Sequence, residues 1–178
     1  MSAYKYEDGL VTDRLYTRFL TPGDIEPWMA FFADKESIQY FPWVENTTDL
    51  ERSRQWIEKQ FARYKENRYG LQALIRKDTD EFIGQCGLLK QDVNGTFELE
   101  VGYHIFRKFW GNGYAPEAAK AFFDYGLKND QADSLISIID INNLKSQRVA
   151  EKNGLVREKQ IHWMGMDIYV YRMPNPVE

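Results

Sequence analysis

Three strand patterns follow one another between residues 71 and 106, and this run constrains the fold more than any other part of the chain. They cover residues 71–77, 82–90 and 97–106, with only short turns between them. Asn94-Gly95 is the dipeptide typical of a tight hairpin turn, because both of its positions require positive φ. Successive strands joined by short turns pair antiparallel. The sequence therefore predicts an antiparallel meander at the centre of the fold.

Further helical and strand patterns extend this meander on both sides. A strand is expected at 12–20, followed by a turn at 21–24 in which Asp24 is a candidate helix N-cap. Helices are expected from about 25, at 49–67, from 116 to 128 or 129, and at 145–152. The last strands are expected at 135–139, 155–163 and 165–173. This order predicts an α/β (α+β) fold with a mixed, mostly antiparallel sheet of about seven strands flanked by helices.

Length and charge limit the functional classes. The 178 residues predict a single domain, 1–178, with its core at about 12–173. There are 23 Lys and Arg against 27 Asp and Glu, a net charge of −4, which argues against direct nucleic-acid binding. Two histidines and one cysteine cannot supply a zinc site by themselves, so no metal is expected.

The same evidence bears on location and assembly. No apolar run approaches the roughly 18 residues of a membrane span, and the N-terminus lacks the apolar core of a signal peptide. The single cysteine, Cys86, fits a reducing compartment and is expected to be a buried structural thiol. We therefore expect a cytoplasmic protein without a membrane partner. It is expected to be a monomer or a homodimer, because a C-terminal strand at a sheet edge could pair with a second subunit.

A glycine-rich segment at residues 107–117 carries the strongest sign of ligand binding. Gly111 and Gly113 let the backbone approach a ligand or adopt positive φ. Pro116 is expected at the first helical position, preceded by Ala115, a poor N-cap. The first N–H groups of the helix would then lack a side-chain acceptor, and such helix starts bind anions such as phosphate. Two cationic residues open the segment and add local positive charge.

The segment alone does not identify the ligand. Pro116 replaces the third glycine of the dinucleotide motif GxGxxG, and the phosphate loop GxxxxGK[ST] is absent from the chain. Glycine turns before helices also occur where nothing binds, so an ordinary structural turn is the alternative interpretation.

Four ordered motifs together resemble the GCN5-related N-acetyltransferase (GNAT) family, in particular its RimJ/RimL-type branch. The run Lys108-x-x-Gly111-x-Gly113 resembles the acetyl-CoA pyrophosphate loop of that family, Q/R-x-x-G-x-G/A. The other three are Glu100-Val101-Gly102-Tyr103 upstream, and Asn143-Leu144-Lys145-Ser146 and Glu151-Lys152-Asn153-Gly154-Leu155 downstream. The chain departs from the family pattern at Lys108, Pro116 and Leu155, where Gln/Arg, Thr and Phe are common; none of these changes removes a glycine.

The resemblance implies acetyl-CoA as the cosubstrate. The backbone of His104, Ile105 and Phe106 would pair with its pantetheine arm. The pyrophosphate would bind the loop, whose expected contact residues are Lys108, Trp110, Gly111, Asn112, Gly113, Tyr114 and Ala115. Asn143 resembles the residue that contacts the pantetheine amide.

The resemblance also implies acetyl transfer to a primary amine by direct attack in a ternary complex. Glu100 is the expected general base, with Glu98 or His104 as substitutes, because the alternation of a strand puts all three on one face. Ser146 resembles the proton donor to the departing thiolate, and a tyrosine could serve instead. The structural alternative is that Asn143 is an N-cap and Ser146 a first-turn residue of a helix.

The acceptor site is expected near the aromatic residues of the first helix and the loop at 40–43. Phe41 and Trp43 are the candidate walls, and Glu98 a candidate contact for a cationic amine. A protein N-terminus or a small-molecule amine is the expected acceptor. Two other functions remain open at this point: a noncatalytic acyl-CoA-binding or sensor module, and a binding module for another nucleotide.

Overall fold

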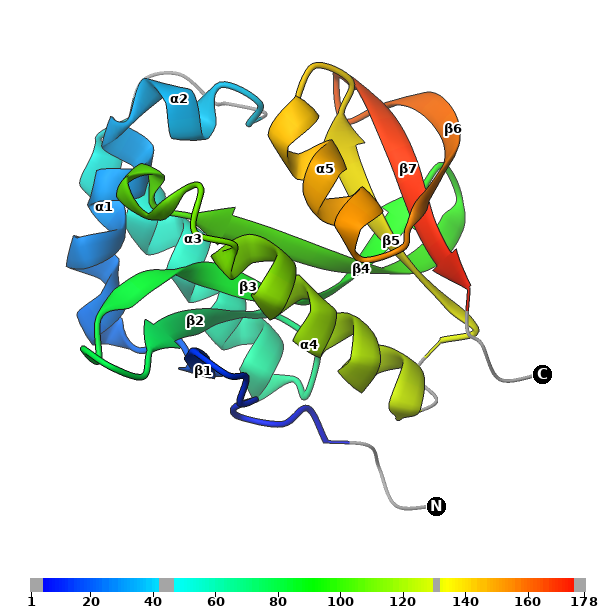
Figure 1. Cartoon of the computed structure of the whole chain (residues 1–178). Helices are drawn as coiled ribbons and strands as arrows, with labels where there is room; N and C mark the ends of the chain where they lie inside the picture. The colour runs from blue at the N-terminus through cyan, green and yellow to red at the C-terminus, as the bar shows by residue number, and fades with distance from the viewer. Residues whose placement is uncertain (1–4, 42–46, 130–131, 175–178) are drawn as a thin grey trace.

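A seven-stranded sheet forms the centre of the computed structural model, which describes residues 5–41, 47–129 and 132–174 (Figure 1). Its strands are β1 (Leu15–Phe19), β2 (Leu71–Arg76), β3 (Phe82–Val93), β4 (Thr96–Ile105), β5 (Ser134–Asp140), β6 (Val156–Trp163) and β7 (Met166–Pro174). Their order is β1-β2-β3-β4-β5-β7-β6. Only β4 and β5 are parallel neighbours, so the prediction of a mixed, mostly antiparallel sheet is confirmed.

Helices cover both faces of this sheet. They are η1 (Pro22–Asp24), α1 (Ile25–Ala33), α2 (Lys35–Ile38), α3 (Asp49–Lys65), η2 (Arg107–Phe109), α4 (Tyr114–Lys128) and α5 (Leu144–Lys152). In Figure 1, α4 crosses one face of β3 and β4, whereas α3 lies behind the sheet. The short helix α2 was not predicted, because four residues give too little periodicity to detect.

The hairpin between β3 and β4 forms at the predicted turn. Asn94 and Gly95 have φ values of 52° and 92°, as a type I′ turn requires. The two strands pair without interruption from Val93↔Thr96 to Gly84↔Ile105. This register fixes which β4 side chains face α3 and which face α4.

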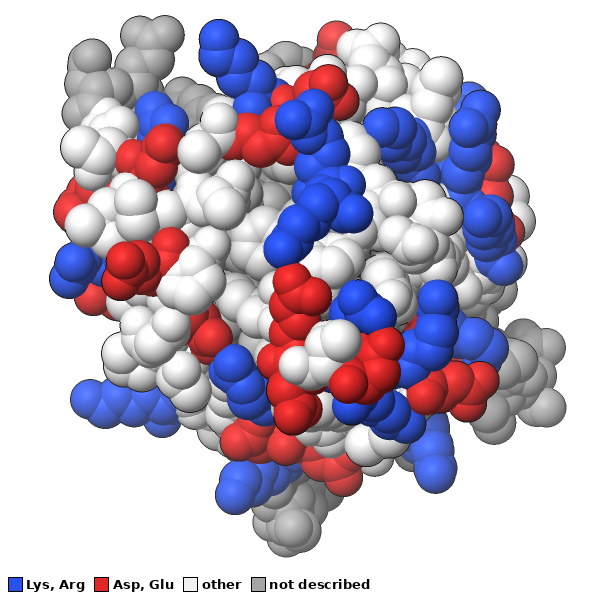
Figure 2. Space-filling model, turned by 60° about the vertical axis from the view of Figure 1, so that its left-hand side comes forward, with Lys and Arg blue, Asp and Glu red and all other residues white. Residues whose placement is uncertain are grey.

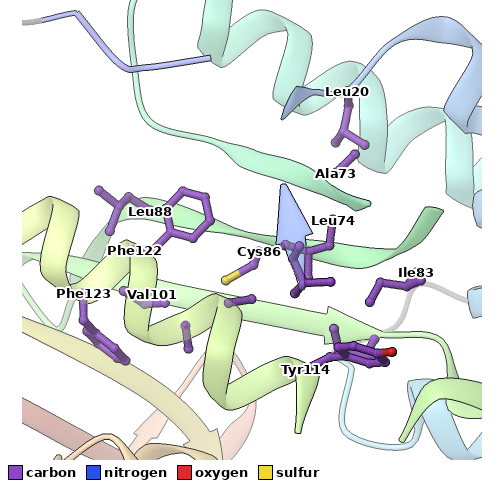
Figure 3. Close-up of a cluster of buried hydrophobic side chains, with 14 of the residues drawn as sticks. Leu20, Ala73, Leu74, Ile83, Cys86, Leu88, Val101, Tyr114, Phe122 and Phe123 are labelled. Carbon is purple, nitrogen blue, oxygen red and sulfur yellow. The ribbon is translucent and has the colours of Figure 1, made fainter. Parts of the chain in front are cut away.

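The main core cluster includes residues of the sheet, of α4 and of the helices α1 and α3. Phe122 and Phe123 are fully buried and share a cluster with Leu88 and Val101 of the sheet (Figure 3). Cys86 points into the same cluster and is buried, as expected of a structural thiol. Apolar residues at helical spacing on α4 explain this packing, because they place one continuous apolar stripe against the sheet.

The structure corrects one prediction about a helix start and refines another. Helix α4 begins at Tyr114 rather than near Pro116, and its N-cap is Gly113 with φ 78°, not Ala115. The positive φ turns the chain into the helix two residues earlier, and Pro116 is tolerated because first-turn N–H groups have no intrahelical acceptor. Asp24 is the N-cap residue of α1, as predicted, but its side chain does not cap that helix; its carboxylate accepts from the backbone N of Thr21 and pairs with Arg18 at 2.8 Å.

The C-terminal strand does not lie at an edge. β7 pairs with β5 on one side and β6 on the other, which leaves β1 and β6 as the edge strands. The expected dimer contact through the last strand is therefore wrong, because that strand is already paired on both sides within the described residues.

Candidate active site

Strands β4 and β5 separate at the centre of the sheet. Their one registered pair is Glu100↔Ile136, and Ser137 Oγ donates to the carbonyl oxygen of Val101 at 2.9 Å just beyond it. β4 continues to Ile105 with no further partner on β5 among the described residues. The second half of β4 thus has a free backbone edge, to which an extended ligand can add hydrogen bonds as an extra strand would.

The glycine loop follows β4 directly. Gly111 and Gly113 have φ values of 79° and 78°, and no atom lies within 4 Å of where a Cβ on Gly111 would be. The backbone N–H groups of residues 111–115 have no acceptor within the described part of the chain. Several free donors at the start of the 15-residue helix α4 form a site suited to phosphate.

Side chains on both sides hold this loop in place. Arg14 Nη1 donates to the carbonyl oxygen of Asn112 at 2.8 Å, and its Nε pairs with Glu117 of α4 at 2.8 Å. Trp110 Nε1 donates to the carbonyl oxygen of Ile105 at 2.8 Å, and Lys145 Nζ of α5 lies 4.0 Å from its ring centroid. These contacts fix the position of the free backbone N–H groups of residues 111–115.

Glu100 lies at the point where β4 and β5 separate. It is 7% exposed, and its carboxylate accepts from the backbone N of Ile138 at 3.2 Å and from Gln91 Nε2 at 3.3 Å. Burial raises the pKa of Glu100 to about 7, while these two hydrogen bonds and the charge of Arg63 oppose the rise. The carboxyl can therefore both give up and accept a proton near neutral pH.

This pKa predicts how stability depends on pH. The folded chain holds the Glu100 proton up to about pH 7, whereas an unfolded glutamate loses it near pH 4.5. Between these values the folded state binds more protons, so the free energy of unfolding falls as pH rises. One pKa unit is worth 1.36 kcal/mol, so we expect a loss of about 2–3 kcal/mol from pH 5 to 8.

Urea denaturation at pH 5, 6, 7 and 8 measures this slope in the wild type and in Glu100→Gln. The variant should lack most of it, because the neutral amide does not titrate. An equal slope in both proteins would show that the carboxyl is not the group responsible.

His104 packs among aromatic rings on the same face as Glu100. Its ring centroid lies 5.1 Å from that of Phe41, 5.4 Å from Trp56 and 5.7 Å from Phe31. Burial lowers the pKa of His104 to about 4. The imidazole is neutral at pH 7 and a weak base, so it suits a wall better than proton abstraction.

Asn143 and Ser146 lie at the start of α5. Asn143 Oδ1 accepts from the backbone N of Ser146 at 3.2 Å, which is the helix-cap arrangement. The carbonyl oxygen of Ser146 accepts from the Tyr103 hydroxyl at 2.9 Å. Burial raises the pKa of Tyr103, so this hydroxyl keeps its proton. Both residues line the cleft.

One cleft of about 1330 Å³ brings most of the predicted residues together. The predicted residues that line it are Phe41, Glu100, His104, Ile105, Trp110, Gly111, Gly113, Tyr114, Ala115, Asn143 and Ser146. It runs from the glycine loop, along the gap between β4 and β5, to the side chains of α3. This volume exceeds that of a typical single small-molecule pocket, as expected for a site that holds two substrates.

Other predicted residues lie elsewhere. Glu98 is held by Arg172 in a two-bond ion pair at 2.8 and 3.1 Å and does not line the cleft. Lys108 Nζ pairs with Glu81 at 2.9 Å, and Phe106 packs on Trp28 with ring centroids 5.0 Å apart. Asn112 Nδ2 caps carbonyl groups of its own loop. Trp43 lies outside the described residues.

Several cleft residues were not found from the sequence. On α3 these are Lys59 and Arg63, which follow Trp56 at helical spacing, and on β3 it is Gln91. The only sequence sign of Lys59 and Arg63 is two cations four residues apart on one helix. Solvent-exposed helix faces commonly show the same spacing, so it does not indicate a binding site. Arg14 was likewise missed, because it lies nearly a hundred residues from the loop that it holds.

The surface charge, the possible metal ligands and the apolar character of the helices were also compared with the predictions. On the face in Figure 2, acidic and basic side chains are interspersed rather than gathered in one basic surface. Within the described residues, His, Cys, Asp and Glu side chains form no group of three that could hold a metal ion. No helix in the described ranges is both long and apolar enough to span a membrane.

Comparison with known proteins agrees with this geometry. The acetyltransferase (GNAT) domain family matches residues 14–156. The Bacillus subtilis (strain 168) protein YkkB is 36% identical over 165 residues, which cover 91% of this chain and 93% of the relative. The N-acetyltransferase YoaA of the same strain is 31% identical over 171 residues, covering 95% and 92%.

Solved structures share the fold. The acetyltransferase from Agrobacterium tumefaciens str. C58 is 26% identical, with a TM-score of 0.78 over 97% of this chain and 98% of that one. RimL, a ribosomal L7/L12 alpha-N-protein acetyltransferase in complex with coenzyme A, is 14% identical, with a TM-score of 0.75 over 93% and 96%; this likeness concerns the fold alone. Because the family match extends over most of the sequence and two relatives exceed 30% identity, the chain belongs to the GNAT acetyltransferase family, whose members transfer acetyl groups from acetyl-CoA to amines.

Proposed function

We propose that this protein transfers the acetyl group of acetyl-CoA to a primary amine by direct attack within a ternary complex. The observation that carries the proposal is the buried Glu100 carboxyl, placed in the same cleft as a loop of free backbone donors. One end of the cleft suits a pyrophosphate, and the middle holds a group that can take a proton from an amine. The noncatalytic alternative gives no reason for a buried carboxyl at that position.

The residues present fit acetyl-CoA. The donors of residues 111–115 would hold its pyrophosphate. Gly111 and Gly113 have positive φ and no side chain, so the backbone can approach the phosphate groups closely. The free edge of the second half of β4, including the backbone N–H of Ile105, would pair with the amide groups of its pantetheine arm. The Ile105 carbonyl oxygen already accepts from Trp110 Nε1. When bound, acetyl-CoA supplies the activated acetyl group. Asn143 lines the same cleft; its Oδ1 accepts from the backbone N of Ser146, so its Nδ2 would be the group that contacts the same arm.

Glu100 is the proposed general base. Its pKa of about 7 is close to that of an α-amine, about 7.7–8.0, so the proton moves with little free-energy cost. A lysine amine, with a pKa near 10.4, would demand more of the same group. Glu98 is already bound to Arg172, and His104 is too weakly basic, so neither substitutes well.

Ser146 is the proposed donor to the departing sulfur, with Tyr103 in support. The Ser146 hydroxyl lines the cleft on the α5 side of the gap. Because a serine hydroxyl is a weak acid, it would act by hydrogen bonding or by relaying a proton. The Tyr103 hydroxyl already donates to the Ser146 carbonyl oxygen, which fixes the start of α5 beside β4.

The proposed acceptors are protein N-termini and small-molecule primary amines. The motif resemblance to the RimJ/RimL-type branch supports an α-amine. Phe41 and the rings near it would form one wall of the acceptor site. We also propose a cytoplasmic location, because acetyl-CoA is available there.

Release of free CoA thiol from acetyl-CoA tests the proposal directly. The protein should release thiol only when an N-terminal peptide or a small amine is present. A thiol reagent suits the assay, because Cys86 is buried and will not react quickly with it. Tight acetyl-CoA binding with no release across an N-terminal peptide and amine library would favour the noncatalytic module instead.

The contact between Arg14 and the loop gives a further prediction. Arg14→Ala removes the hydrogen bond to the Asn112 carbonyl oxygen and the ion pair with Glu117. The loop is then held less rigidly. We expect acetyl-CoA binding to weaken about fivefold, which corresponds to about 1 kcal/mol for a partly exposed contact. Calorimetric titration measures this change, and Arg54→Ala on α3 is a matched control that does not touch the loop.

A further inference from the structure

Cationic side chains from α3 line the acceptor end of the cleft. Lys59 and Arg63 are four residues apart, so both project from the same side of the helix as Trp56. No acidic residue of α3 lines the cleft. Like charges at this spacing destabilise a helix by a few tenths of a kcal/mol, so the pair does not stabilise α3.

Neither cation has an acidic partner in the structure. No carboxylate of the described residues lies within ion-pair distance of Lys59 or Arg63. Arg63 is half-buried, and its Nη1 donates to Gln60 Oε1 at 3.0 Å. Gln60 in turn accepts from the backbone N of Leu71 at 2.9 Å, which anchors this stretch of α3 on the sheet. Arg63 is therefore a positioned cation with no ion-pair partner among the described residues.

These cations lie at the Glu100 end of β4 and away from the glycine loop. Trp56 packs on His104, near the end of β4, whereas Arg63 is close enough to Glu100 to influence its charge. A strand rises about 3.4 Å per residue, so Glu100 and Ile105 are about 17 Å apart. Along α3 from Trp56 to Arg63, the side chains therefore lie progressively farther from the proposed pyrophosphate site.

A different set of cations serves the loop. Lys145, Arg148 and Lys152 of α5 also line the cleft, and Lys145 lies over the Trp110 ring beside the loop. The phosphate groups of acetyl-CoA therefore have cationic neighbours of their own. Lys59 and Arg63 remain for the second substrate.

We infer that the acceptor is an acidic amine, whose carboxylate binds Arg63 and Lys59 while its amino group faces Glu100. This inference rests on the proposed acetyl transfer and names the acceptor class for it. It also replaces the expectation of an acidic site for a cationic amine, since Glu98 is bound to Arg172. The carboxylate can come from an acidic residue near a peptide N-terminus or from the α-carboxylate of a free amino acid.

Two matched acceptor series distinguish these sources. The first is a C-terminally amidated peptide with glutamate at its second and third positions, compared with its glutamine and lysine counterparts. The second is free alanine compared with alanine amide. For each series, CoA release gives kcat/KM at one pH, and the ratio of acidic to neutral acceptor is the readout. A ratio cancels any change in Glu100 that affects both acceptors equally.

We expect the wild type to prefer the acidic member of one series by at least about tenfold, as a charge-assisted contact gives. Arg63→Gln should reduce that ratio to about twofold or less, and Lys59→Gln should reduce it partly. Lys65→Gln, an exposed cation on the same helix outside the cleft, should leave it unchanged. The preference should also weaken as salt is raised.

The possible failures are distinct. Equal turnover of acidic and neutral amines, or an unchanged ratio in Arg63→Gln, would overturn this inference and leave acetyl transfer intact. No CoA release with any acceptor would overturn the proposed function, and this inference with it.

Discussion

Glu100→Gln should lower kcat by about 10²–10³-fold while leaving acetyl-CoA affinity nearly unchanged, because it removes a general base and no cofactor contact. The amide has almost the same shape as the carboxyl and can still accept a hydrogen bond from the backbone N of Ile138. In the wild type, kcat/KM should rise with pH through an apparent pKa near 7, because the ionised carboxylate is the active form. That inflection should be absent from the variant.

Steady-state kinetics from pH 5.5 to 9, with calorimetric titration of acetyl-CoA, measure both effects. Glu158→Gln is a control, because it neutralises an exposed carboxylate that pairs with Arg172 outside the cleft. A larger loss of kcat in Glu98→Gln than in Glu100→Gln would show that Glu98, and not Glu100, is the general base.

Gly113→Glu should weaken acetyl-CoA binding by at least about 100-fold, or about 2.7 kcal/mol. Gly113 has φ 78°, which side chains rarely adopt, and a Cβ there would lie 3.4 Å from Arg14 Nη2. The added carboxylate would also stand among the free donors of residues 111–115, where it would compete with and repel a pyrophosphate.

Gly95→Glu is the matched control for this change. Gly95 has φ 92° with open space around it, so the substitution adds the same charge and comparable backbone strain at the hairpin turn. Calorimetry should show normal acetyl-CoA affinity for that variant, and thermal unfolding should show similar destabilisation of both proteins. Equal affinity in Gly113→Glu and wild type would mean that the ligand does not use this loop.

The position of the sites along the chain was predictable because short-range patterns encode it. The hairpin turn at Asn94-Gly95 and the alternation along β4 placed Glu100 and His104 on one face. The glycine loop after β4 predicted an anion site, and the structure shows free backbone donors there, although the start of α4 was placed two residues late. That error arose because proline signals a first turn without saying which of its positions it occupies.

Partners distant in sequence could not be predicted. Glu98 and Glu100 look equivalent in the sequence, yet Arg172 binds the first and burial raises the pKa of the second. Lys108 occupies the Gln/Arg position of the pyrophosphate-loop motif, but its ammonium group pairs with Glu81. These outcomes depend on which side chains the fold brings within about 4 Å, and no local pattern contains that information.

Local sequence patterns were enough to predict the order of strands and helices, the glycine loop and the family that these features resemble. Periodicity, turn residues and glycine positions act over a few neighbours, so they can be interpreted along the chain. The packing of distant segments determines which carboxyl is buried in the gap between β4 and β5, and that Arg63 lies near it with no ion-pair partner among the described residues. Burial and charge pairing arise when distant segments pack together, and they set the chemistry of the cleft.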